Sequence, residues 1–211
     1  MIMENCMKIV FFKIAWMREY RGNKDGGDEP IYSGMKNKKI EDVHEKYNFT
    51  PVRINDEDFC LGFFETKNYR KKVGNQLHIE RIQGSELSHR EDFLEDVLVV
   101  YCANQATYGY TTVVGWYKHA TVFRYYQTMD FEERGIQKYN AIARACDCVL
   151  LPVKLRSEIN VWQVPNTKRG WPFGFGRADV WYASEDDGKL TEYLNRLSSQ
   201  IENYSGENWI K

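Results

Sequence analysis

The sequence contains no uninterrupted apolar run long enough to cross a bilayer, and its beginning does not match a secretory signal. Glu4, Asn5 and Lys8 interrupt the stretch that a signal peptide would keep apolar. These absences argue against a membrane-spanning protein and against a secreted one. We therefore expect a cytoplasmic protein that has no membrane partner.

Paired cysteines and several catalytic motifs are also missing. The five cysteines form no C-x-x-C pair, and three of them stand in apolar runs, where a free thiol packs as a small core residue. The four histidines follow no H-E-x-x-H or mixed Cys/His spacing of a zinc site. The motifs G-x-x-x-x-G-K-[ST], G-x-G-x-x-G and G-x-S-x-G do not occur. We therefore predict no cofactor, no metal site and no catalytic residue of these classes.

An excess of charge of either sign is absent too, since 29 Lys and Arg residues stand against 30 Asp and Glu residues. A net charge of -1 argues against a protein that coats nucleic acid, because that mode needs many phosphate contacts and a basic face. A local basic rim around a pocket is compatible with this balance. Aromatic residues are plentiful instead, at 15% of the chain, and supply large rings to a core or to a pocket.

The pattern along the chain indicates a single domain over residues 1–211, because no repeat, low-complexity tract or linker divides it. Apolar residues at helical spacing predict helices over 136–146 and 189–204. Strands are predicted where β-branched and aromatic residues lie between turn-formers. The predicted strands cover residues 8–16, 59–66, 76–82, 96–103, 111–117, 120–126 and 148–155. This order favours an α+β protein with a mixed, barrel-like sheet.

One pattern typical of nucleases begins at Asp58, which precedes an apolar strand that leads to Glu65 and Lys67. Two carboxylates and a lysine at a strand end can hold a divalent ion and orient a water toward a phosphodiester. The same segment, "ETKNYRKK", is equally typical of a solvated basic turn. A metal-dependent endonuclease therefore stays an alternative, while a binding protein without enzymatic activity is favoured.

The aromatic residues gather at strand ends and in loops as well as in apolar runs. Rings at such places can sandwich a planar base, because stacking and a few edge hydrogen bonds hold an extruded nucleotide. Core packing is the alternative for each ring, since a protein with six tryptophans must bury most of them. At Gly115 and Trp116, a missing side chain beside a large ring could admit a base.

Six segments together resemble a bacterial family of modules that precede HNH-type nuclease domains in restriction-like proteins. They are "IAWMREYRG" (14–22), "YNFTP" (47–51), "VLVVYCA" (97–103), "VVGWYKHATVFR" (113–124), "LLPVKLR" (150–156) and "GFGRADVWYA" (174–183). Their order is also similar to the PUA-like superfamily, whose EVE and YTH members read modified bases. The resemblance implies a PUA-like mixed β-barrel flanked by helices, with a C-terminal helix. The chain carries no convincing copy of the HNH signature, so any nuclease would be a separate chain or absent.

The function that this resemblance implies is the recognition of a flipped base in DNA, with 5-substituted cytosine favoured and RNA left open as the ligand. Three stacking rings and three groups for edge hydrogen bonds are expected to bind the base: Trp16, Trp116, Trp181, Tyr20, Asn104 and Tyr117. Four basic residues are expected to contact phosphates: Lys118, Arg124, Lys154 and Arg156. The remaining alternative is an interaction protein of a restriction or phage-defence system that has no nucleic-acid site.

Overall fold

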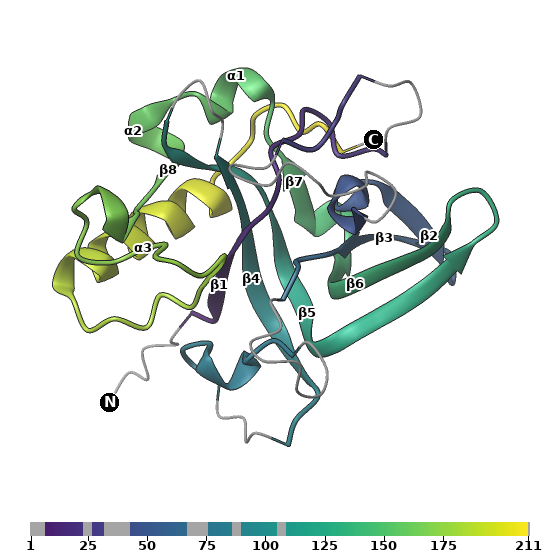
Figure 1. The fold of residues 1–211 in the computed structure, drawn as a ribbon, viewed down its shortest axis with the longest axis horizontal. Coiled ribbons are helices and arrows are strands. Elements are labelled where there is room, and N and C mark those ends of the chain that lie inside the picture. The colour runs from purple at the N-terminus through teal and green to yellow at the C-terminus, as the bar shows by residue number, and fades with distance from the viewer. Residues whose placement is uncertain are drawn as a thin grey trace.

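The structure is a computed structural model that describes residues 7–22, 27–31, 43–66, 76–85, 90–104 and 109–210. It is a mixed α+β protein in which one large sheet dominates and few helices are added (Figure 1). The strands are β1 (Ile9–Lys13), β2 (Pro51–Ile54), β3 (Glu57–Gly62), β4 (Phe93–Asn104), β5 (Thr111–Phe131), β6 (Gly135–Arg144), β7 (Cys148–Leu150), β8 (Gln163–Val164) and β9 (Val180–Trp181). The α-helices are α1 (Val153–Arg156), α2 (Ile159–Trp162) and α3 (Gly188–Glu202). Short 3-10 helices include His44–Tyr47 and Ile79–Arg81.

The sheet is organised around β5, the longest strand at 21 residues. Its one edge pairs with β4, whereas its other edge pairs first with β8 and β7 and then with β6. The full order is β2-β3-β6-β5-β4-β1-β9, in which β1 runs parallel to β4. The pairings among the described residues leave β2 and β9 at the two ends of this path, so they do not close the sheet into a barrel.

Two hydrophobic cores lie on opposite faces of the sheet, because successive side chains of a strand point to opposite faces. In β4, Val99 and Tyr101 enter the first core, whereas Val100 and Cys102 enter the second. Helix α3 covers the second face and inserts four buried residues: Leu190, Tyr193, Leu197 and Ile201. In Figure 1 the helix lies on one side of β1 and β4, and the arm of β2, β3 and β6 lies on the other.

The C-terminal helix and most strands are confirmed. The predicted helix over 136–146 is wrong, because residues 135–144 form β6, which pairs with both β3 and β5. In β6 the buried amides of Gln137 and Asn140 donate to the carbonyls of Leu61 and Phe64. These cross-strand partners outweigh a helical spacing that a short apolar segment also satisfies as a strand.

Four predicted strands differ in detail from the observed elements. Residues 111–117 and 120–126 belong to one continuous strand, β5. Residues 76–82 form an isolated bridge and a 3-10 helix, and residues 148–155 divide into β7 and α1, with Pro152 at the helix N-cap. Within the described chain, no helix is both long and apolar enough to cross a membrane.

Candidate functional site

The residues that were expected to bind a base are divided between the two cores. Trp16, Tyr20 and Tyr117 belong to the first core, whereas Trp116 and Trp181 belong to the second. Each of these five side chains is at most 6% exposed. Because the sheet separates the two groups, they do not form one pocket, and that part of the sequence-based prediction needs correction.

Trp116 packs inside the second core. Its ring stacks on Trp162 with 5.4 Å between the centroids and meets the ring of Tyr204 edge-on. A Cβ atom on Gly115 would lie 2.3 Å from the carbonyl oxygen of Val149 and 2.7 Å from the ring of Phe49. The space beside Trp116 is therefore filled by protein, and the prediction that a base enters there is wrong.

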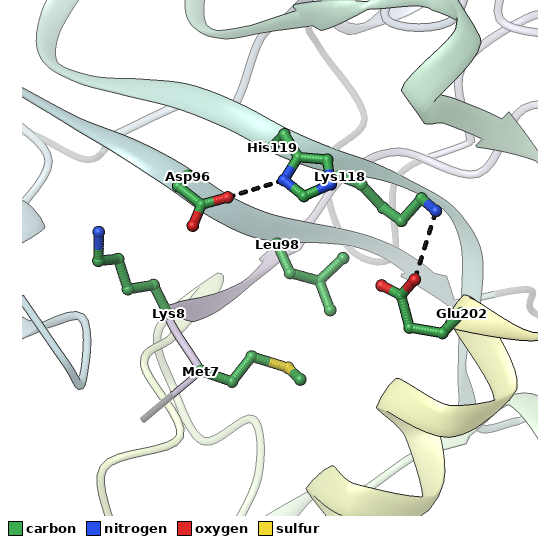
Figure 2. Close-up of a pocket in the computed structure, with 7 residues that line it drawn as sticks. All are labelled: Met7, Lys8, Asp96, Leu98, Lys118, His119 and Glu202. Carbon is green, nitrogen blue, oxygen red and sulfur yellow. Dashed lines mark hydrogen bonds and ion pairs between the residues drawn. The ribbon is translucent and has the colours of Figure 1, made fainter. Parts of the chain in front are cut away.

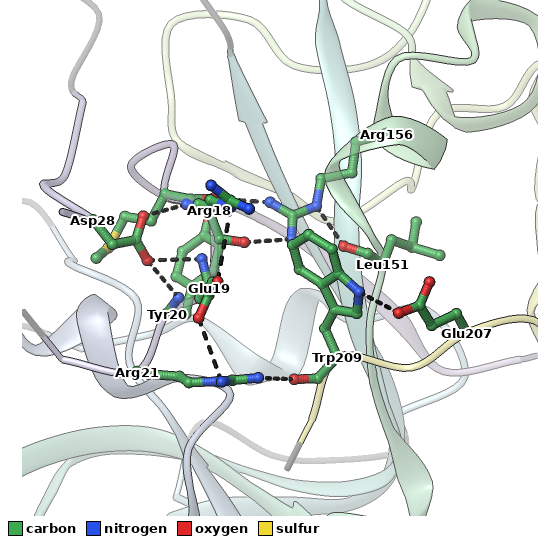
Figure 3. A network of polar contacts seen from close by, with 10 residues as sticks. Arg18, Glu19, Tyr20, Arg21, Asp28, Leu151, Arg156, Glu207 and Trp209 are labelled. Carbon is green, nitrogen blue, oxygen red and sulfur yellow. Dashed lines mark hydrogen bonds and ion pairs between the residues drawn. The ribbon is translucent and has the colours of Figure 1, made fainter.

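Arg156 was expected to contact phosphate, but it is fully buried and binds backbone carbonyls of the protein (Figure 3). Its guanidinium donates to the carbonyl oxygens of Leu151, Met17 and Arg18 at 2.7, 2.8 and 2.8 Å. Burial lowers the pKa of Arg156 to about 10. The three hydrogen bonds join Arg156, the last residue of α1, to the chain after β1 and to the Leu151 carbonyl, which is a structural role.

The segment after β1 is also held by a carboxylate (Figure 3). Asp28 accepts hydrogen bonds from the backbone N–H groups of Arg18, Glu19 and Tyr20. Tyr20 has a positive φ of 52°, and its hydroxyl donates to the carbonyl oxygen of Ala15 at 2.7 Å. Burial raises the pKa of Tyr20, so the hydroxyl is neutral and bonded within the protein.

Among the other predicted contacts, Arg124 is 3% exposed and donates to Glu80 at 2.6 Å and to the carbonyl oxygen of Glu91 at 2.7 Å. It is therefore not placed to contact a phosphate. The Asn104 side chain accepts from the Thr111 hydroxyl at 2.5 Å. Lys154 is exposed.

Lys118 lines an open pocket of about 250 Å³ (Figure 2). Its Nζ lies 3.5 Å from the carboxylate of Glu202, and His119 bonds to Asp96 at 2.7 Å on the same rim. Leu98 and Met7 complete the lining together with Lys8. Two lysines and two carboxylates leave the rim without a net charge from these groups, so the pocket does not form the basic rim that was expected.

A smaller cavity of about 190 Å³ lies between the chain that follows β3 and the chain around β9. We call it the seam cavity, because these strands belong to the two ends of the open sheet. One wall consists of Phe64, Glu65 and Thr66, and the opposite wall of Ala178, Asp179, Val180 and Tyr182. Gln76, Leu77 and His78 complete the lining.

The first wall of the seam cavity is held by side chains in place of a neighbouring strand. The Asn140 amide bonds to both the N–H and the carbonyl of Phe64, at 3.0 and 2.8 Å. The Tyr126 hydroxyl accepts from the N–H of Thr66 at 2.7 Å. The ring of Phe64 stacks on Phe12 with 4.6 Å between the centroids. This wall is therefore rigid although its backbone is outside β3.

The opposite wall is tied to residues 76–82 by Tyr182. Its hydroxyl accepts from the N–H of His78 at 3.2 Å, and the guanidinium of Arg81 lies 4.5 Å from its ring centroid. Burial raises the pKa of Tyr182 to about 12. Glu80 joins His78 to the buried Arg124 through contacts of 2.9 and 2.6 Å. Arg124 thus positions this wall.

The residues of the nuclease pattern are not brought together. Asp58 lies near the start of β3, where it is exposed and pairs with Arg53 at 3.2 Å. Glu65 lies beyond the other end of β3 and lines the seam cavity. Lys67 lies outside the described residues. Within the described ranges no three His, Cys, Asp or Glu residues form a group that could hold a metal ion.

The sequence pointed to one wall of the seam cavity and missed the other. The segment 174–183, which carries part of the resemblance, contains Ala178, Asp179 and Tyr182. Phe64 and His78 were missed, because nothing in their local pattern shows that they face residues so distant along the chain. The one local sign of a site on this wall is that Phe64 follows the end of a strand and stands beside polar residues.

No protein family, no curated protein and no solved structure matches this chain. The class is therefore defined by the fold itself: a mixed α+β protein built on one large open sheet.

Proposed function

We propose that the protein is a nucleic-acid-binding module of PUA-like architecture that reads a single extruded base in the seam cavity. The observation that carries the proposal is that two aromatic residues, Phe64 and Tyr182, line the opposite walls of one small cavity. At about 190 Å³ the cavity is smaller than typical sites for drug-sized ligands, which measure about 300–1,000 Å³. It therefore suits one small planar group.

The chemistry of the lining suits a base. Aromatic rings supply stacking, which contributes about 1–3 kcal/mol per base. Carboxylates, as in Glu65 and Asp179, accept from the exocyclic amino group of cytosine, and the amide of Gln76 can both donate and accept. The favoured ligand is a 5-substituted cytosine in DNA, within a restriction or phage-defence system that supplies any nuclease as a partner.

The PUA-like barrel is part of the same proposal. A long strand that pairs with different partners along one edge, together with a parallel β1, is compatible with a barrel that stays open at the seam. The opening between the two ends of the sheet is then the entrance for the base.

Equilibrium binding to fluorescent duplexes with modified or plain cytosine, and to matching RNA, tests this function. Ala178 is exposed and lines the cavity, so Ala178→Trp is expected to fill it and weaken binding by roughly tenfold or more. Ser184→Trp is the matched control, because Ser184 is exposed directly after the 174–183 segment and does not line the cavity. Equal affinity of Ala178→Trp and the parent would refute the site.

The same assay with and without magnesium addresses the other functions. Cleavage by the chain alone, lost in Asp58→Asn, would favour the endonuclease, although Asp58 lies near the start of β3 and Glu65 lies beyond its other end. Absence of both binding and cleavage would favour an interaction protein without a nucleic-acid site.

A further inference from the structure

A second cavity, of about 360 Å³, lies between β2 and the turn that joins β5 to β6. We call it the arginine cavity, because three arginines from three separate segments line it: Arg21, Arg53 and Arg134. The rest of the lining consists of Tyr47, Thr50, Pro51, Val52, Phe131, Glu132 and Glu133. None of these residues belongs to the seam cavity, so the two cavities are separate sites.

Arg134 occupies the last position of a three-residue turn between Phe131 and Gly135, which are paired across the hairpin. Gly135 has a φ of +69°, as expected for the residue that closes such a turn. The guanidinium lies 3.9 Å from the ring centroid of Phe131 and 4.7 Å from that of Tyr47. Two aromatic rings therefore hold the guanidinium in place, with contributions of the cation–π type.

The aromatic contacts leave hydrogen-bond donors of Arg134 unused. Its Nε and one terminal nitrogen, Nη2, are buried from solvent and have no hydrogen-bond partner. Burial also lowers the pKa of Arg134, although Tyr47 and Glu133 oppose that shift. A buried donor without an acceptor is destabilising, and more so when the group is charged. An acceptor that enters the cavity would remove this cost.

Arg21 presents the same feature. Its terminal nitrogens reach the carboxylate of Glu19 at 3.4 Å and the carbonyl oxygen of Trp209 at 3.0 Å (Figure 3). Its Nε is buried and has no partner. Because Glu19 and Trp209 fix the guanidinium, the Nε donor keeps one orientation beside the cavity.

Gly22 explains how Arg21 and Tyr47 come together. A Cβ atom on Gly22 would lie 2.4 Å from Cε1 of Tyr47, and the φ of Gly22 is +72°. Its N–H donates to the carbonyl oxygen of Lys46 at 2.8 Å. Only glycine fits this close approach, so the backbone at Gly22 seats the Tyr47 ring against the segment that carries Arg21.

We propose that the arginine cavity binds a phosphate group, presented as a phosphomonoester or a phosphodiester, through Arg134 and Arg21. A phosphate offers several oxygens in different directions, which matches unused donors on two guanidinium groups. A carboxylate offers two oxygens in one plane, which a single guanidinium already satisfies. The donors without partners belong to Arg134 and Arg21, whereas Arg53 is paired with Asp58, and Glu132 and Glu133 also line the cavity. The proposal does not depend on base recognition in the seam cavity.

The direct test observes the arginine Nε–H signals by NMR while inorganic phosphate, a deoxynucleoside monophosphate, a short oligonucleotide or acetate is added. We expect the Arg134 and Arg21 signals to shift and saturate with the phosphate-bearing probes and to stay unchanged with acetate. The monophosphate and the oligonucleotide distinguish a monoester from a diester. Equal shifts with acetate, or no saturable shift with any phosphate probe, would overturn the proposal.

Variants give a second readout. Arg134→Ala is expected to weaken the binding of the preferred probe by roughly tenfold to a hundredfold, and Arg134→Lys to restore only part of it. Arg144→Ala is the control, because Arg144 is exposed at the far end of β6, pairs with Glu57 and does not line the cavity. Loss of binding in Arg144→Ala equal to that in Arg134→Ala would show nonspecific attraction and refute the site. Ala178→Trp is expected to leave phosphate binding unchanged, which separates this test from that of base recognition.

Discussion

Asp96 and His119 face each other across β4 and β5, and both have a backbone conformation that L-residues rarely adopt. Their φ angles are +57° and +50°, and their side chains are joined by a hydrogen bond of 2.7 Å (Figure 2). The register of β4 against β5 shifts on either side of the Val97–Ala120 pairing, and Asp96 lies within one shift and His119 within the other. Asp and His tolerate the left-handed region better than most residues, which makes them suitable at an irregular position between two strands.

Substitution of His119 distinguishes the effect of its backbone conformation on stability from the effect of its hydrogen bond to Asp96. His119→Val is expected to lower the free energy of unfolding by about 1–2 kcal/mol, because a branched side chain is strained at positive φ. His119→Gly is expected to change it by less than about 0.5 kcal/mol, since relief of strain offsets the loss of an exposed pair. Urea denaturation measures both. Equal losses in the two variants would show that the side-chain contact dominates.

Arg156 is expected to be essential for stability. Arg156→Leu leaves three backbone carbonyl oxygens without their buried donors, which should lower the free energy of unfolding by at least about 3 kcal/mol. Lys154→Ala, an exposed change in the same short helix, should alter it by less than about 0.5 kcal/mol. Chemical denaturation compares the two. A small effect of Arg156→Leu would contradict this structural role of its side chain.

The link through Glu80 predicts a dependence of stability on pH. Burial alone would raise the pKa of Glu80, but hydrogen bonds from Arg124 and His78 outweigh burial and lower it from 4.5 to about 2. The carboxylate therefore stabilises the fold above about pH 4.5, and this contribution is lost as the pH falls toward 2. Urea midpoints between pH 6 and pH 2 should show a smaller decrease in Glu80→Gln. Glu192→Gln, an exposed change on α3, should retain the decrease of the parent.

Gly115 provides a test of the filled space beside Trp116. Gly115→Ala should lower the free energy of unfolding by about 1–3 kcal/mol, because the added methyl group overlaps the Val149 carbonyl and the Phe49 ring. Gly188→Ala is the control, since nothing lies within 4 Å of the position of its Cβ. Thermal unfolding of the two variants decides the matter. Tolerance of alanine at 115 would mean that the space is open after all.

The local sequence pattern was sufficient to predict the elements that bury an apolar face or run in a core. The spacing of Leu190, Leu197 and Ile201 predicts α3, and all three are buried in the second core. The β-branched and aromatic residues of 96–103 predict β4 in the same way. Free cysteines were expected in the core, and Cys60, Cys102 and Cys148 are buried without disulfides, although Cys146 is exposed.

The local sequence pattern did not predict structure that depends on contacts with residues far away in the chain. The spacing in β6 predicts a helix, whereas the carbonyls of Leu61 and Phe64, which accept from Gln137 and Asn140, favour a strand. Arginine type alone suggested phosphate contacts at Arg124 and Arg156, whereas burial assigns both to internal bonds. The unused donors of Arg134 depend on the spatial approach of Tyr47 and Phe131, which no spacing in the sequence reveals.

Side chains that alternate between the two faces of β5 also constrain how the protein unfolds. Trp116 and Tyr117 are adjacent in the chain but serve different cores, so a slip of one residue against β4 would exchange the contents of both at once. Neither core can melt without releasing the strand on which the other is built. We therefore expect both halves of this 211-residue chain to unfold in one cooperative transition.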